Sequence, residues 1–291
     1  MQAQRRSVSG RTWSAIAIWS IALAALYGRV LINLGRNWMA DDSYSHGWLV
    51  APISLWLVWQ QRERLRQAPM RPAASGLLLV LGSLAWFIAG SLAAELFTTR
   101  ISLIGLLAGT VVFVYGWRHL RIVAFPLAFL VFMIPLPSVL FDRMTQSLQL
   151  VASGLGERLL RAADFAVLRD GNILTLSSIT LQVTDACSGI RSLMSLLTVT
   201  SLVAYLFEPT LVRQVALTMA AVPLAIVLNG FRVAFTGIAA SRFGPEMARG
   251  LIHEMSGWAV FIAAFVAIWL LHRALRFMTR VDHSPGVLEA A

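Results

Sequence analysis

The sequence predicts an all-α polytopic membrane protein, and two observations lead to this prediction. Hydrophobic residues make up 58% of the 291 residues, whereas charged residues make up only 13%. Soluble globular domains carry about 25% charged residues, so this composition excludes an ordinary soluble fold. In addition, apolar windows of about 20 residues, the length that a helix needs to cross a bilayer, recur along the chain.

Eight such windows indicate about eight transmembrane helices in one membrane domain over residues 1–291. They fall at about 12–34, 47–60, 75–94, 101–117, 121–141, 188–207, 211–240 and 255–274. The second window is short, and the fifth contains Pro126, Pro135 and Pro137, which interrupt helices. We therefore expect these two segments to be tilted, kinked or partly re-entrant. We find no internal repeat and no second domain.

The distribution of arginine predicts the orientation in the membrane. The net charge is +10, and all 24 basic residues are arginine. When eight spans alternate, the arginine-rich short loops fall on one side, which should be the cytoplasm. This places both termini, including the tail at 275–291, in the cytoplasm of a cell whose inner membrane holds the protein. The positive charge then faces anionic lipid, and no basic stripe interleaved with aromatics indicates nucleic-acid binding.

The largest predicted non-membrane segment, 142–186, should lie outside the cytoplasm. Its first part, 142–163, has apolar residues at helical spacing, which is typical of an amphipathic helix on the bilayer surface. An Asp170-Gly171 turn between two β-branched, alternating runs predicts a small β-hairpin. The hairpin leads the chain directly to Cys187.

Cys187 is the only cysteine, so it is either a small core residue or a nucleophile. Asp185 is a good N-cap for the apolar run that follows, which places Cys187 in the first helical turn, where unpaired N–H groups stabilise a thiolate. Arg191 lies one turn further on and would lower the thiol pKa further. Arg191 has an equally good alternative, which is to pair with Asp185 or with a lipid phosphate.

Two further polar residues fall at the predicted outer level of the membrane. Arg232 lies inside the window 211–240, where a charge costs about 2.5–3.5 kcal/mol and therefore needs a partner or a task. Asn229 shares its helical face and would hold the guanidinium, although snorkelling to the interface is the alternative for Arg232. His253 precedes the last window, where an ordinary interfacial histidine is the alternative. Together with Cys187, these residues bring a thiol, a guanidinium and an imidazole to one level, the set that acyl transfer requires.

The motifs resemble those of the exosortase/archaeosortase family of membrane transpeptidases. The segments 185–192 and 229–233 and the isolated His253 look like its three signatures, and the stretches 44–47 and 134–137 are also similar, so the resemblance runs from about 40 to 275. It implies that Cys187 is the nucleophile, Arg232 the transition-state stabiliser and His253 the general acid and base. Tyr44 and His46 become candidates for substrate recognition; a capped helix start in which Gly47 allows close packing is the alternative.

The resemblance also implies the substrates and the reaction. These would be membrane-anchored proteins with a C-terminal sorting tail, made of a Pro-Glu-Pro-like motif, one transmembrane helix and an arginine-rich end. A cysteine peptidase or transpeptidase would cleave the tail outside the membrane through a thioester. No cofactor is expected, and the acids near His46 match no metal-ligand spacing. Two alternatives remain, a transporter or lipid-linked-sugar handling protein of exopolysaccharide export and a non-enzymatic assembly partner. The sequence specifies neither the acyl acceptor nor the oligomeric state.

Overall fold

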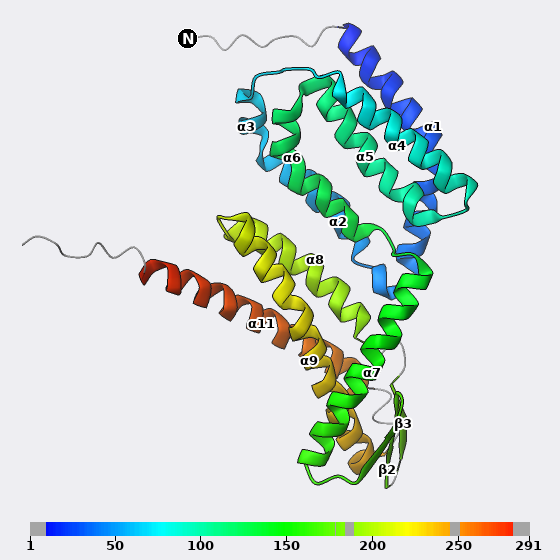
Figure 1. Cartoon of the computed structure of the whole chain (residues 1–291), viewed down its shortest axis with the longest axis vertical. Helices are drawn as coiled ribbons and strands as arrows, with labels where there is room; N and C mark the ends of the chain where they lie inside the picture. Colours follow the sequence, from blue (N-terminus) through cyan, green and yellow to red (C-terminus); the bar gives the residue numbers. More distant parts are fainter. Residues whose placement is uncertain (1–9, 178, 184–188, 245–250, 282–291) are drawn as a thin grey trace, which may run out of the picture. The chain divides into compact units, whose positions relative to one another are not determined.

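The chain consists almost entirely of helices, which confirms the predicted fold class. The computed structural model describes residues 10–177, 179–183, 189–244 and 251–281, and the chain divides into two compact units, Met1–Pro135 and Leu136–Ala291 (Figure 1). Within the described ranges, six helices are long and apolar enough to cross a membrane: Ala17–Ala40, Ser75–Leu92, Leu96–Tyr115, Ile190–Phe207, Leu211–Phe243 and Met255–Ala274. Large apolar side chains on them are exposed, among them Leu78 and Trp86, as expected where lipid rather than water covers the surface.

The number of spans is lower than the eight predicted, for two reasons. Helix α2 (Gly47–Gln60) has 14 residues, and at a rise of 1.5 Å per residue it is about 21 Å long, too short for a hydrocarbon core of about 30 Å. The window 121–141 is interrupted between Met133 and Ser138, where Pro135 and Pro137 lack the N–H groups that a helix needs. Counting the helices on either side of this break as one broken span gives a total of seven.

The first unit is held together by close helix packing. Its elements are α1 (Gly10–Ala40), η1 (Asp42–Tyr44), α2, α3 (Arg62–Gln67), α4 (Ser75–Leu92), α5 (Leu96–Tyr115), α6 (Trp117–Phe129) and η2 (Leu130–Met133). Helices α4 and α5 pack so closely that a Cβ on Gly76 would overlap the backbone of Phe113, and one on Gly109 would lie 2.8 Å from the backbone nitrogen of Val80. Small residues of this kind let membrane helices approach each other closely.

The second unit contains the predicted insertion. Helix α7 (Ser138–Ala162) is followed by the antiparallel strands β1 (Val167–Asp170), β2 (Ile173–Leu176) and β3 (Thr180–Gln182), in the order β1-β2-β3. A helix and a hairpin are thus present where the sequence predicted them, and β3 adds a third strand. The location of the helix on the bilayer surface stays a prediction. The buried face of α7 packs against protein, because Gly156 and Leu160 contact helix α9 at Val233 and Gly237.

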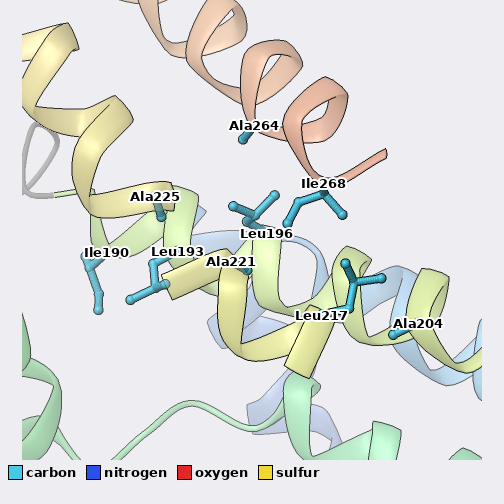
Figure 2. Packing of buried hydrophobic residues seen from close by; sticks show 9 residues of the cluster. All are labelled: Ile190, Leu193, Leu196, Ala204, Leu217, Ala221, Ala225, Ala264 and Ile268. Carbon is cyan, nitrogen blue, oxygen red and sulfur yellow. The ribbon is translucent and has the colours of Figure 1, made fainter. Parts of the chain in front are cut away.

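Three long helices complete the second unit: α8 (Ile190–Phe207), α9 (Leu211–Phe243) and α11 (Leu251–Val281). Figure 2 shows their common core, which is made of Ile190, Leu193, Leu196, Ala204, Leu217, Ala221, Ala225, Ala264 and Ile268. Four of these are alanines, so the helices approach each other closely here. At the end of α8, the buried carboxylate of Glu208 accepts a 2.7 Å hydrogen bond from Nδ1 of His272 on α11. This bond fixes α11 to the α8–α9 turn.

Candidate functional site

Not all of the predicted site lies within the described residues. Cys187 and Asp185 fall in the segment 184–188, outside them, and the side chain of His253 is also outside, although its backbone belongs to α11. The geometry of the candidate site is therefore built from Arg232 and Asn229 on α9 and from the backbone segments adjacent to Cys187 and His253.

Arg232 is buried, with 9% of its surface exposed, and it is held by α11. Its Nε donates a 3.2 Å hydrogen bond to Oγ of Ser256, which is itself buried. Next to Ser256, a Cβ on Gly257 would lie 3.6 Å from Nη2 of Arg232, which is an ordinary van der Waals contact, so the guanidinium lies against this part of α11. A buried cation costs free energy unless it has a hydrogen-bond partner, and Ser256 is such a partner for Arg232.

Asn229 lies one turn before Arg232 and contacts the start of α8. It is 2% exposed, and a Cβ on Gly189 would lie 2.8 Å from its Cγ. Gly189 has a φ of +82°, in the left-handed region that favours glycine, and its carbonyl accepts the first bond of α8 from Leu193 at 2.8 Å. Only a glycine meets both conditions, the close contact with Asn229 and the positive φ.

The prediction that the helix begins directly after Asp185 is wrong. Helix α8 begins at Ile190 with Gly189, not Asp185, as its N-cap. Cys187 comes before this cap in the sequence and lies outside the described residues. The reason is the positive φ of Gly189, which turns the chain before the helix can start. Arg191 is the second residue of α8 and is exposed.

Two contacts link α9 to the start of α8 and to the early part of α11. Asn229 packs against Gly189 of the α8 cap, and Arg232 bonds to Ser256 of α11. Asn229 and Arg232 are three residues apart and therefore share a face of α9. The start of α8 and the early part of α11 thus both pack against this face of α9.

A comparison with family models identifies the chain. The model described as transmembrane exosortase matches residues 38–270, which is most of the sequence. The chain belongs to the exosortase family. Searches of curated proteins and of solved structures found no match. The predicted resemblance is thereby confirmed for the family, and the match includes Cys187, Arg232 and His253.

In this exosortase, His46 and Tyr44 belong to the first unit, whereas Asn229 and Arg232 belong to the second. Nε2 of His46 is 3.1 Å from the carbonyl oxygen of Phe132, and Nε1 of Trp38 donates a 2.8 Å bond to that of Met133. Both carbonyls precede the break at Pro135, where regular helix bonding stops. Tyr44 is buried beside this contact, with its ring centroid 6.4 Å from that of His46.

These contacts support the structural alternative for the stretch at 44–47. A Cβ on Gly47 would overlap the indole of Trp38, so Gly47 does allow close packing. Burial lowers the pKa of His46, and its hydrogen bond to the Phe132 carbonyl opposes this only in part. A neutral ring with Nε2–H as the donor fits that carbonyl. Among the described residues, no group of three or more histidine and acidic side chains is arranged to hold a metal ion.

Ser256 is the residue of the candidate site that the sequence prediction missed. Its signal was weak but present, since it is the one polar residue in the apolar stretch 255–271, three positions after His253. A small hollow between α7, α8 and α9 borders both Gly189 and Asn229, and Leu148, Ala152 and Ala225 also line it. The hollow lies directly beside the start of α8, and its lining is mostly apolar.

We predict that Gly189→Ala destabilises the protein more than an alanine substitution at another glycine with positive φ, because the added Cβ also meets Asn229. The substitution strains a left-handed backbone, at roughly 1–2 kcal/mol, and also drives a Cβ into Asn229. Gly171→Ala is the matched control, because Gly171 has a φ of +58° but nothing lies within 4 Å of a Cβ there. Thermal unfolding in detergent and the rate of alkylation of Cys187 should both change more in Gly189→Ala. Equal effects in the two variants would show that the contact with Asn229 is unimportant.

Proposed function

We propose that this exosortase is a membrane cysteine transpeptidase or endopeptidase that cleaves C-terminal sorting tails of exported proteins. The observation that carries the proposal is the buried Arg232 fixed to Ser256 of α11, on the same α9 face as the Asn229 that contacts Gly189. This arrangement supports a site in which Cys187, just before α8, and His253, on α11, approach the guanidinium. The proposal includes an active site that faces outward.

The proposed reaction is an acyl transfer in two steps. His253 takes the proton of the Cys187 thiol, and the thiolate attacks the carbonyl carbon of the scissile peptide bond. The C–N bond then breaks, His253 returns the proton to the leaving amine, and a thioester joins the substrate to Cys187. Water or an amine next attacks the thioester, the C–S bond breaks, and the thiol takes back its proton.

Arg232 would stabilise the negative oxygen that forms in both steps. A guanidinium carries five N–H donors, and the Nε–H of Arg232 is bound to Ser256. Because Ser256 holds it before the reaction, the guanidinium need not reorient as charge develops, and such preorganised electrostatic stabilisation is usually the largest single contribution to catalysis. The buried location strengthens this interaction, since little water competes for the oxyanion.

The test uses the full-length exosortase in proteoliposomes with a reporter, called here the tail reporter. It carries a soluble domain, a Pro-Glu-Pro motif, one transmembrane helix and an arginine-rich end. The expected result is release of the soluble domain with a new C-terminus beside the motif, identified by mass spectrometry. A second reporter, with the motif replaced by Ala-Ala-Ala, should stay intact. Equal cleavage of both reporters, or of neither, would overturn the proposal.

A further inference from the structure

Strand β3 forms one edge of the small sheet, and its pairing with β2 fixes the direction of its backbone groups. The register pairs Ile173 with Gln182 and Thr175 with Thr180. Leu176 and Ile179 exchange backbone hydrogen bonds, which makes them a hydrogen-bonded pair. Hydrogen-bonded and non-hydrogen-bonded pairs alternate along an antiparallel ladder. The N–H and C=O groups of Thr180 and Gln182 therefore point away from β2, toward the open edge.

This edge is exposed and chemically unprotected. Thr180 and Gln182 are exposed, and in the part of the chain that the structure describes their outward backbone groups meet no further strand. Proteins protect such edges with very short strands, charged residues, proline or a covering element, because an open edge pairs readily with another strand. Strand β3 is short, but its three residues, Thr-Leu-Gln, include neither a charge nor a proline. The edge is therefore suited to pair with a short extended segment.

The edge is also firmly anchored to the helices of the candidate site. Val183, the residue after β3, is fully buried, and its N–H and C=O bond to the backbone and side chain of Asn172 at 2.9 and 3.0 Å. The turn between β1 and β2 is tied to α7, because Oγ of Ser153 donates a 3.0 Å bond to the carbonyl of Gly171. Helix α7 in turn packs on α9, which carries Arg232. The position of β3 is thus fixed relative to the helix that carries the guanidinium.

We propose that the edge of β3 binds the substrate beside its scissile bond, as an extended peptide that adds a fourth strand to the sheet. This inference rests on the proposed function. Cys187 follows Gln182 by five residues, which span at most about 17 Å even when fully extended. A substrate segment paired with Thr180 and Gln182 would therefore need only a few further extended residues to place its scissile bond at the thiol. Backbone pairing of this kind binds through main-chain groups and tolerates different side chains.

Gln182→Pro tests the inference, with Gln182→Ala as its matched control. Proline at 182 removes the outward N–H and places a ring in the path of an added strand, but it leaves the β2–β3 bonds intact, because the 182 N–H does not point toward β2. Alanine removes the same side chain and keeps the edge. For the tail reporter we expect KM to rise about tenfold in Gln182→Pro, with kcat nearly unchanged, and to stay near wild type in Gln182→Ala. Alkylation of Cys187 at the wild-type rate shows that the proline variant keeps its site.

The possible outcomes separate this inference from the proposed function. If both variants cleave the tail reporter with the wild-type KM, the edge does not bind substrate, although the function stands. If Gln182→Pro instead changes the oligomeric mass in detergent and leaves KM unchanged, a second copy occupies the edge and the inference is overturned. An equal rise of KM in both variants would assign the effect to the glutamine side chain and also overturn it. A wild-type protein that leaves the tail reporter intact overturns the proposed function itself.

Discussion

Replacing Cys187 with serine is expected to lower cleavage of the tail reporter at least about 10³-fold, while the protein still folds and inserts. A serine hydroxyl has nearly the size of the thiol but stays protonated at neutral pH, so it cannot replace a thiolate as the nucleophile. The measurement is the initial rate of release of the soluble domain from proteoliposomes. Thermal unfolding and detergent elution profile should match those of the wild type.

The single cysteine makes the control for this prediction simple. Because the chain contains no second thiol, treatment of the wild type with iodoacetamide modifies Cys187 alone and should abolish cleavage as completely as the substitution does. Both treatments also separate an enzyme from a transporter or an assembly partner, for which Cys187 is dispensable. Retention of cleavage after complete alkylation would exclude the thiol as the nucleophile.

The second large effect is expected at Arg232. Arg232→Ala should lower kcat about 10²–10³-fold with little change in KM, because the guanidinium acts on the oxyanion, which exists only during the reaction. Arg232→Lys keeps the charge but loses the planar donor group and the Nε–H that bonds to Ser256, so it should recover only part of the loss. Steady-state kinetics with the tail reporter measures both variants.

Two matched substitutions control the Arg232 experiment. Arg242→Ala removes an exposed arginine near the end of the same helix and should leave kcat unchanged. Ser256→Ala keeps the guanidinium but removes the side chain that fixes it, so it should lower kcat by about tenfold or less. An Arg232→Ala variant as active as Arg242→Ala would mean that the buried guanidinium has no part in the reaction and serves the packing of α9 on α11.

The sequence predicted the parts of the fold that depend on hydrophobicity and local turn chemistry. The long apolar windows form helices, because a membrane helix needs about 20 apolar residues. A hairpin forms at the predicted place, but its two turn residues are Gly171 and Asn172 rather than Asp170 and Gly171, because Asp170 pairs with Ile173. The number of spans was less predictable, since an apolar run such as Gly47–Gln60 fits either a short crossing or a buried helix. The length of the helix that the run forms in the structure decides between these two possibilities.

The sequence pointed to candidate site residues, whose roles stay predictions, but it could not predict the contacts around them. The cost of a charge inside a span drew attention to Arg232, and its burial agrees with that reasoning. Its partner Ser256 and the Gly189–Asn229 contact depend on how α9 packs against α8 and α11, which sequence spacing within one helix does not reveal. The late start of α8 followed from the φ of one glycine. Local propensity favours Asp185 as a cap, and it gave no sign of this left-handed turn.

The central claim, that Cys187 forms a covalent link to its substrate, can be tested by mass spectrometry of a single peptide. The tail reporter is mixed with the wild-type exosortase, the reaction is quenched with acid within seconds, and the peptide that contains Cys187 is analysed. The account predicts an adduct in which the carbonyl carbon at the cleavage site is bonded to Sγ of Cys187, and hydroxylamine should release it as a hydroxamate. Cleavage of the reporter at the wild-type rate with Cys187 unmodified at every quench time would contradict it.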